Sequence, residues 1–498
     1  MRYQYTYENP FNVEAELISH LRTLDSELFY CQDQRKSLQL PADLEGELEA
    51  LLQKLPTMRD GKKLLLSGVP PDEKLAVQQW EHYGEFLYML WFIVRYTEKL
   101  RLDLILSSAY FFSITHSEDG TGKEFESLND NVEGTRLLIL PKIKTIHDPL
   151  DPSEEALEED RTGGGQKHWA TDRMPGIQDM LSHTFYVDVD MLAYQDHQYR
   201  VMHSILERHM FTENRKTLRI AVCPLAHKDL LQTKTYLGDG NQRLFCVEGL
   251  KCTDFVHDRI KAAFMRAGEQ HADILIFPEM LADETVLSRG FFEETKEMLS
   301  SHGYPMPALI LLPTWWHDHR NELYVLDAAG KRLCVQQKQI RYLFSEKETG
   351  ELYAEALREP EAVIHMVHIP EVGRFAFPIC RDFLESGYVQ LLLQQLRSTF
   401  LICPSYSPNK TQFDLTAPGV IQYGCYTVWC NTCAAYYDSE RLPGHIGLVA
   451  GPQEIPATMC LLSPQCGGNC EDEAQSCVFL VEISMDRSAV ITCEHIYR

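Results

Sequence analysis

The chain has 498 residues, of which 44 % are hydrophobic and 10 % aromatic, and this is enough for two or three domains with sizeable cores. Its 72 acidic and 47 basic residues give a formal net charge of -25. Such a charge opposes binding to nucleic-acid phosphates and to anionic membrane surfaces. We therefore expect neither a nucleic-acid partner nor a membrane partner.

The cysteines and the apolar runs indicate a cytoplasmic protein with free thiols. The 15 cysteines are roughly 3 % of the chain, far fewer than in disulfide-rich secreted proteins. The first residues, Met1 to Tyr5, lack the basic-then-apolar pattern of a signal peptide. The longest apolar run, Phe86 to Val94, has nine residues, whereas a membrane-spanning helix needs roughly 20.

The first part of the chain is predicted to be mainly helical. Leucines recur at intervals of three and four, and we assign residues 1–147 to a helical domain that also holds a β-like run at Leu137 to Ile143. Residues 148–215 contain prolines, glycines and a block of acidic residues, which predicts an acidic linker. A connecting helix is expected from about Asp190, as its N-cap, to about Met210.

Residues 216–498 show a different pattern, in which short apolar runs alternate with helix-like segments. This alternation predicts a layered α/β domain. The strands are expected at residues 218–223, 272–278, 308–313, 322–326, 333–337, 363–369, 373–379, 400–403 and 426–430. Helices are expected at residues 252–268 and 389–396, and a hairpin turn at Asp327 to Gly330.

Three of these strands end next to a chemically potent residue: Glu279, Lys338 and Cys380. Taken singly, a charged residue at a strand end is commonly a solvated cap, and a free cysteine commonly packs in a core. Taken together, the three have complementary roles. A thiolate attacks an electrophilic carbon, a carboxylate takes and returns the proton, and an ammonium stabilises the oxyanion.

The segments Ile276 to Glu279, Gln337 to Ile340 and Ile379 to Asp382 closely resemble the Glu, Lys and Cys motifs of the nitrilase, or carbon-nitrogen hydrolase, superfamily. The motifs occur in the order and at the spacings found in that family. The resemblance covers residues 217 to about 490. Further matching marks are Asn321 to Asp327 with Gly330, Cys403 to Ser405, Asn431, and Gly444 to Pro452.

The resemblance implies an α-β-β-α sandwich that commonly forms homodimers or higher homo-oligomers. It implies that Cys380 attacks the carbon of a small amide or nitrile substrate and that Glu279 acts first as general base and then as general acid. Lys338 and the backbone N–H of Arg381 would hold the oxyanion. No metal and no organic cofactor are expected.

Family members often carry a second glutamate after the lysine, which helps to position it. The resemblance points to Glu346, eight residues after the lysine, with Glu348 as the fallback.

The sequence departs from the family at the residues after the nucleophile. Many members continue with an aromatic residue and a longer Asp-x-Arg-Phe-Pro pattern, whereas Arg381 to Glu385 is compressed here. This departure concerns the substrate pocket more than the reaction. The candidate pocket residues are Tyr406, Phe383 and Trp315, and for each of them simple packing is the alternative.

Two groups of histidines or cysteines are close enough in the sequence to be considered as metal ligands. His317 and His319 stand two residues apart, and the tail contains Cys460, Cys466, Cys470 and Cys477. Neither group has the compact paired spacing of a structural zinc site. The sequence therefore predicts no metal site, with zinc in the tail as the lesser alternative.

The leading hypothesis is a cysteine-dependent hydrolase of a non-peptide carbon-nitrogen bond, in an amide rather than a nitrile. One alternative is a regulated or partner-binding assembly in which residues 1–215 control the hydrolase domain. Another is an acyl transferase, in which an amine intercepts the thioester formed on Cys380.

Overall fold

The computed structural model describes residues 184–206 and 217–496 apart from 346–349, 371, 439–441, 453–457, 467–476 and 485–490. Earlier in the chain it describes 6–7, 15, 18, 64–65, 124–127 and 136–141. The chain divides into two compact units, one of Met1–Ile143 with Pro149–Leu192 and one of Lys144–Asp148 with Ala193–Arg498. Most of the predicted helical domain and of the acidic linker lies outside the described residues.

The first unit is described through two strand pairs. Strand β3 (Leu137–Pro141) pairs antiparallel with β4 (Thr184–Asp188), and β1 (Thr6–Tyr7) pairs antiparallel with β2 (Leu64–Leu65). The β-like run predicted from Leu137 is therefore confirmed as a strand.

The second unit is built on two large sheets and one small one. The eight-stranded sheet has the order β13-β14-β12-β11-β8-β24-β25, with β15 also paired to β14. Its strands are β8 (Thr217–Val222), β11 (Ile274–Ile276), β12 (Leu309–Leu311), β13 (Trp315–His317), β14 (Arg320–Asp327), β15 (Arg332–Gln337), β24 (Val478–Ser484) and β25 (Ile491–Ile496).

The seven-stranded sheet has the order β23-β22-β21-β20-β19-β18-β7. Its strands are β7 (Arg200–Ile205), β18 (Val363–Ile369), β19 (Gly373–Ala376), β20 (Phe400–Ser405), β21 (Tyr426–Asn431), β22 (Gly447–Gly451) and β23 (Thr458–Leu461). The four-stranded sheet has the order β16-β17-β10-β9, formed by β9 (Leu231–Leu237), β10 (Arg243–Leu250), β16 (Leu343–Ser345) and β17 (Leu352–Glu355). A small hairpin joins β5 (Ala193–Tyr194) to β6 (His197–Gln198).

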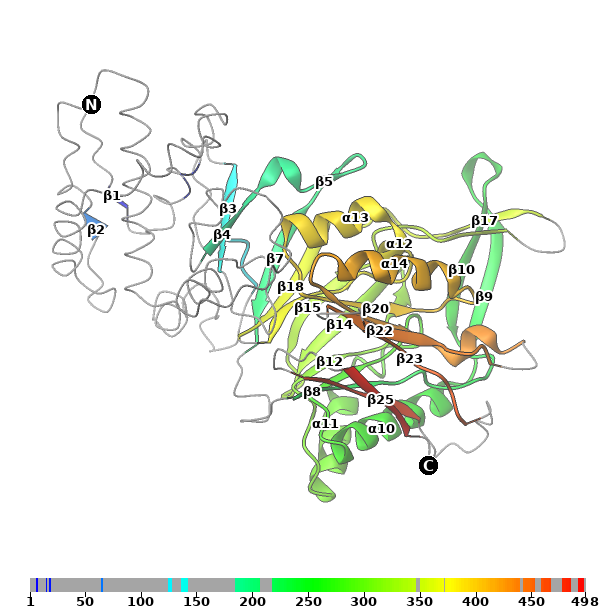
Figure 1. Cartoon of the computed structure of the whole chain (residues 1–498). Coiled ribbons are helices and arrows are strands. Elements are labelled where there is room, and N and C mark those ends of the chain that lie inside the picture. Colours follow the sequence, from blue (N-terminus) through cyan, green and yellow to red (C-terminus); the bar gives the residue numbers. More distant parts are fainter. Residues whose placement is uncertain are drawn as a thin grey trace, which may run out of the picture. The chain divides into compact units, whose positions relative to one another are not determined.

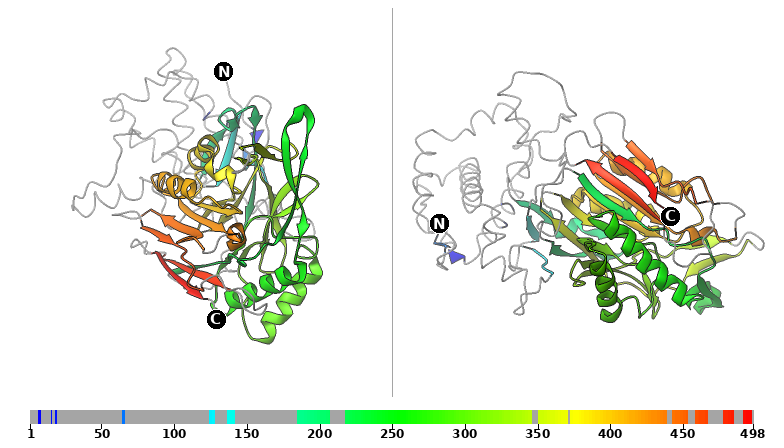
Figure 2. Two further views of the ribbon diagram at one scale, coloured as in Figure 1. Left: turned by 90° about the vertical axis from the view of Figure 1, so that its right-hand side faces the viewer. Right: turned by 90° about the horizontal axis from the view of Figure 1, so that it is seen from below.

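Helices cover the outer faces of the two large sheets. In Figure 1, α10 (Thr253–Glu269) and α11 (Arg289–Ser301) lie on one side of the sheets, and α13 (Ser386–Gln390) and α14 (Thr411–Ile421) lie on the other. The short helix α12 (Arg381–Leu384) precedes α13. The two views in Figure 2 show the same layering. The second unit is thus an α-β-β-α sandwich. None of its described helices combines the length and the apolar composition that a membrane crossing requires.

Strand β21 shows why its sequence suits the middle of this sandwich. All six of its residues are buried, which is typical of a strand covered on both faces. The Trp429 ring stacks on Phe413 of α14 with the ring centroids 4.4 Å apart. The neighbouring Cys430 thiol points the other way, toward two carbonyl groups of the eight-stranded sheet. One belongs to Ile276 in β11 and the other to Cys223, which directly follows β8.

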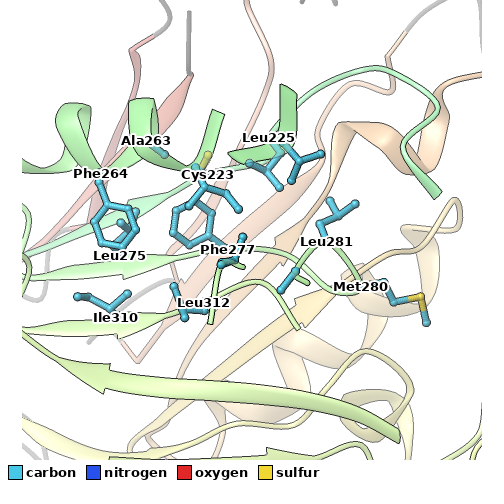
Figure 3. Close-up of a cluster of buried hydrophobic side chains, with 14 of the residues drawn as sticks. Cys223, Leu225, Ala263, Phe264, Leu275, Phe277, Met280, Leu281, Ile310 and Leu312 are labelled. Atoms are coloured by element: carbon cyan, nitrogen blue, oxygen red, sulfur yellow. The ribbon is translucent and has the colours of Figure 1, made fainter. Parts of the chain in front are cut away.

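The core beneath α10 is apolar. Figure 3 shows Phe264 of this helix beside Leu275, with Phe277 close by, and the rings of Phe264 and Phe277 have centroids 5.8 Å apart. The helix predicted at residues 252–268 is confirmed, and its buried face includes Phe255, Ile260, Ala263 and Phe264.

The predicted hairpin turn between β14 and β15 is present. The Asp327 carboxylate accepts hydrogen bonds from the N–H groups of Ala329 and Lys331, both at 2.9 Å. Gly330 has a φ of +79°, and a Cβ atom there would lie 2.4 Å from the Phe292 ring. The turn therefore requires glycine at this position.

The predicted helix from Asp190 to Met210 is wrong for the described part, residues 190–206. These residues form a short 3₁₀ turn, the β5-β6 hairpin and β7. Pairing decides the outcome, because β7 runs parallel to β18 in register from Arg200 with Val363 to Ile205 with His368. The sandwich therefore includes a strand that lies before the predicted domain start at residue 216.

The Gln336 side chain links the two large sheets, and this link is testable. Gln336 is 1 % exposed; its amide donates to the Val363 carbonyl at 3.3 Å and its oxygen accepts from the His365 N–H at 2.9 Å. Gln336→Ala should lower the free energy of unfolding by about 1–3 kcal/mol, because it leaves two partly buried backbone groups without their partner. Urea unfolding would measure it. The exposed Gln232→Ala is the control, and equal losses in both variants would contradict the link.

Candidate active site

The three residues singled out by their strand ends meet in the interior of the second unit. Glu279 follows β11, Lys338 follows β15 and Cys380 follows β19. Their exposed fractions are 0 %, 1 % and 4 %. They are therefore not solvated caps, and their charges and protons are set by one another.

Lys338 lies between two carboxylates. Its Nζ donates to Glu279 Oε1 at 2.8 Å and lies 2.8 Å from Glu355 Oε2 and 3.0 Å from Glu355 Oε1. Glu355, the last residue of β17, is fully buried. An isolated buried ammonium would be costly, so the two carboxylates are what permit it here.

Each carboxylate is fixed by further donors. Glu279 Oε1 also accepts from the Asn321 amide at 2.8 Å, and its Oε2 accepts from the Tyr406 N–H at 2.8 Å. Glu355 Oε2 accepts from the Tyr342 N–H at 2.9 Å. These bonds hold both acids in single orientations relative to the ammonium.

The charges act on the pKa values in the directions that this packing requires. Burial alone would lower the pKa of Lys338, but the charges of Glu279 and Glu355 outweigh it and hold the pKa well above its usual value. Burial raises the pKa of Glu355, and Lys338 opposes this rise. The lysine is therefore a permanent cation at neutral pH.

Cys380 occupies a strained turn between β19 and α12. Its backbone has φ 48° and ψ -102°, outside the regions that residues with a side chain commonly adopt. Two bonds hold it: its N–H donates to the Pro404 carbonyl at 2.9 Å, and its carbonyl accepts from the Phe383 N–H at 3.2 Å. Strain of this kind persists only where the surroundings over-determine it and is concentrated at functional sites.

The Cys380 side chain is a thiol rather than a preformed thiolate. Burial, and then the negative charge of Glu279, raise its pKa well above the usual value, while Lys338 works in the opposite direction. Two carboxylates against one ammonium leave an excess of negative charge around the sulfur. A nucleophilic role for this cysteine would therefore require a base that removes the thiol proton.

Asp382 ties the lysine segment to the cysteine turn. Its carboxylate, fully buried, accepts from the N–H groups of Gln339 at 3.1 Å, Ile340 at 2.8 Å and Ile379 at 3.1 Å. Two of these donors follow Lys338 and the third precedes Cys380. One carboxylate thus joins the segment after Lys338 to the turn that carries Cys380.

The second glutamate predicted from the resemblance, Glu346, and its fallback Glu348 both lie outside the described residues. Besides Glu279, the carboxylate that contacts Lys338 in the structure is that of Glu355. The signal that sequence reasoning missed is a single acid within the apolar run Leu352 to Leu357. A charge enclosed by apolar residues in a strand marks a buried, paired position.

The three predicted pocket residues are placed differently. Tyr406 borders the site, because its N–H binds Glu279, while its hydroxyl donates to the Ala434 carbonyl at 3.1 Å. Phe383 is fully buried and stacks on Phe413 at 6.2 Å, which is packing. Trp315 is half-buried on β13 and stacks on His317 at 3.8 Å.

Arg381, whose N–H was assigned to the oxyanion, is the first residue of α12, and its guanidinium lies 3.2 Å from Glu385.

The two histidines weighed as metal ligands bind different partners. A ring nitrogen of His317 lies 2.9 Å from Glu322 Oε2, and one of His319 lies 2.8 Å from the Ala356 carbonyl.

No protein-family model matches the chain, and no curated protein matches it. Among solved structures, the chain is similar to an amidase from Nesterenkonia sp., a protein described as a member of the nitrilase superfamily. The two are 14 % identical with a TM-score of 0.35, and the alignment covers 55 % of this chain and 93 % of the amidase. A mutant of that amidase in complex with butyramide is 12 % identical (TM-score 0.32; 56 % and 90 %). The C. elegans NitFhit protein is 17 % identical (TM-score 0.32; 56 % and 61 %).

The buried Asp382 predicts a specific pH dependence of stability. Burial raises the pKa of Asp382 from its usual 3.8 to about 7, against the opposing effects of Lys338 and the N–H donors. Between these values the native state keeps a proton that the unfolded chain has lost, so this group makes the protein less stable as the pH rises from about 4 to 7. Asp382→Asn removes the effect, which amounts to at most about 1.4 kcal/mol per pH unit.

The measurement is urea unfolding of wild type and Asp382→Asn at several values between pH 4 and 7.5. The wild type should lose stability relative to the variant as the pH rises. Asp318→Asn, at a side chain that is 92 % exposed, is the control and should show no such trend. A pH-independent difference, or one of opposite sign, would contradict the assignment.

Proposed function

We propose that this chain is a cysteine-dependent hydrolase of a non-peptide carbon-nitrogen bond, with a small amide as substrate. The observation that carries the proposal is a buried Glu279–Lys338 pair beside a cysteine held on a strained turn. The ordered motifs that resemble those of the nitrilase superfamily support it from the sequence. The proposed roles belong to Cys380 as nucleophile, Glu279 as proton carrier and Lys338 as oxyanion partner.

In the first half-reaction, Glu279 takes the thiol proton as the Cys380 sulfur bonds to the amide carbon. The carbonyl oxygen becomes an oxyanion, which the Lys338 ammonium and the Arg381 N–H stabilise. The protonated Glu279 then gives its proton to the nitrogen, the C–N bond breaks, and ammonia or an amine leaves. A thioester remains on Cys380.

In the second half-reaction, Glu279 takes a proton from water as the water oxygen attacks the thioester carbon. The C–S bond breaks, the sulfur recovers the proton by way of Glu279, and the acid is released. Glu279 therefore serves as base and acid twice in one cycle. Its fixation by Asn321 and by the Tyr406 N–H suits this demand, because a proton carrier must stay within reach of sulfur, nitrogen and water in turn.

Glu355 is proposed as a positioning residue. It contacts the Lys338 ammonium as the second carboxylate, in addition to Glu279, and is itself held by the Tyr342 N–H. Burial raises the pKa of Tyr342, and the next largest cause is the nearby Cys380 sulfur, so the tyrosine side chain lies close to the cysteine. Tyr342 is therefore proposed as a wall of the substrate site.

The two alternatives require different experiments. Acyl transfer would show as amide products when amines are added to the assay, while hydrolysis gives the free acid alone. Control by the N-terminal region would show on truncation. Because β7 belongs to the sandwich, the truncated chain should start at Ala193 rather than near residue 215.

Replacement of the nucleophile tests the proposal directly. Cys380→Ala and Cys380→Ser should lower kcat on a panel of amides and nitriles by about 10⁴-fold or more, since no equivalent nucleophile remains. Ammonia release would measure it, and circular dichroism would show that the fold is kept. Cys252→Ser, at a partly exposed cysteine before α10, is the matched control and should keep full activity. Full activity of either Cys380 variant would overturn the proposal.

Glu355→Gln tests the positioning role. The variant keeps an acceptor near Lys338 but removes one of the two charges that raise its pKa, so the pKa should fall. We expect kcat to fall by about 10²–10³-fold, with the alkaline limb of the pH–rate profile moved to lower pH. Glu361→Gln, at an exposed position, should change neither. An unmoved alkaline limb would show that Glu355 does not act through the lysine.

A further inference from the structure

The C-terminal part of the chain brings together two thiols and an imidazole that have no role in the proposed reaction. The ligand atoms of Cys466, Cys477 and His495 all lie within 4.8 Å of one another. Cys477 and His495 are buried and Cys466 is half-buried. Among the described residues, this is the group of three or more such side chains close enough to share one ion.

The three residues come from segments that the fold fixes independently. Cys477 directly precedes β24, and His495 lies in β25, which pairs with β24 so that Phe479 faces His495. The His495 ring stacks on the Phe479 ring with centroids 4.3 Å apart at 14°. Cys466 follows β23, a strand of the other large sheet. The cluster therefore lies where the edges of the two sheets approach.

We propose that Cys466, Cys477 and His495 bind a soft divalent cation, for which Zn²⁺ is the fitting ion. Tetrahedral zinc binds cysteine sulfur at about 2.3 Å and imidazole nitrogen at about 2.0–2.1 Å, which places neighbouring ligand atoms roughly 3.5–3.8 Å apart. Separations of at most 4.8 Å reach that geometry with small side-chain movements. A water molecule, admitted beside the half-buried Cys466, completes the tetrahedron.

Binding changes the protonation of all three ligands. A thiol binds the metal as thiolate, so each cysteine that is protonated gives its proton to water as its sulfur bonds to the ion. The Nδ1 atom of His495 accepts from the Gln465 N–H at 2.9 Å, so the ring proton lies on Nε2. Either ring nitrogen can bind the ion only after the Gln465 N–H turns away, because Nδ1 must then hold either the metal or the ring proton. Gln465 adjoins Cys466, so a movement of this one short segment would both release the Gln465 N–H from the His495 ring and bring the Cys466 sulfur toward the ion.

A second pair of thiols shows what distinguishes this cluster. Cys460 of β23 and Cys493 of β25 are within hydrogen-bond reach of each other, as Cys466 and Cys477 are. The group of potential ligands found among the described residues includes neither Cys460 nor Cys493. Either pair is close enough for a disulfide, but of the two pairs only Cys466 and Cys477 have an imidazole, that of His495, as a further ligand. Cys493 is therefore the matched control, two residues from His495 on the same strand.

The bound ion would act as a staple between the two large sheets. It would join the segment after β23 to the β24-β25 hairpin without touching Cys380, Glu279 or Lys338. We therefore expect the metal to contribute to stability and not to the chemistry of the amide. This makes the metal site and the proposed reaction separately testable.

The experiment uses the full-length protein, purified with a thiol reductant and without chelator. Mass spectrometric metal analysis should find about one zinc per chain in the wild type and in Cys493→Ser. Cys466→Ser, Cys477→Ser and His495→Gln should each hold at least tenfold less. Replacement by Co²⁺ in the wild type should give thiolate-to-cobalt charge-transfer absorption, which weakens in both serine variants. A strong chelator should lower the Tm of the wild type but not that of His495→Gln.

Three results would overturn the site. One is a wild type without zinc even after reduction and addition of Zn²⁺. Another is equal zinc loss in Cys493→Ser and Cys477→Ser. The third is a Cys466–Cys477 disulfide, seen as a 2 Da mass loss in peptide maps, that persists under the reducing conditions. Cys380→Ala should keep its zinc, so failure of the proposed reaction and failure of the metal site remain distinguishable.

Discussion

The ammonium of Lys338, buried between two carboxylates, is the interaction on which the rest of the site depends. A lysine that is 1 % exposed is tolerable only with such partners, because the cost of removing its charge from water is large. Glu279 and Glu355 supply the partners and are held in turn by backbone N–H groups of Tyr406 and Tyr342. The ion triad therefore joins β11, β15 and β17. Removing Lys338 would leave two buried carboxylates without a counter-charge, and removing either carboxylate would take away one of the two negative charges that stabilise the ammonium. Stability therefore depends on the same contacts as the proposed chemistry.

The state of Cys380, the proposed nucleophile, depends in part on this triad. Burial, and then the negative charge of Glu279, raise the pKa of the Cys380 thiol and keep it protonated. In the proposed reaction the proton stays on the sulfur until Glu279 removes it. This requires the thiol and its base to be held together, and a strained turn does so only when it is anchored. Asp382 provides the anchor with three backbone donors, two from the lysine segment and one from the turn itself. Position, rather than a preformed thiolate, is what the fold supplies.

The sequence predicted the core of this arrangement because apolar runs and their ends are local signals. Strands that end at Glu279, Lys338 and Cys380 could be located from alternation and proline alone, and the structure brings their ends together. Non-local pairing explains the failures. The segment before residue 206 joins an edge of the sheet as β7 because β18 pairs with it, which a capping residue cannot reveal. Glu355 belongs to the small four-stranded sheet, whose strands have only a weak alternation of apolar and polar residues. The approach of His495 to Cys466 and Cys477 depends on the antiparallel pairing of β24 with β25.

The most direct test of the account is the mass of the peptide that contains Cys380 after brief incubation of the protein with a panel of amides and nitriles, followed by acid quench. A trapped acyl group on Cys380, absent from Cys380→Ala and lost again with time as water attacks, is the predicted result. Turnover of any of these substrates with Cys380 unmodified at every time point, and with activity retained in Cys380→Ala, would contradict it.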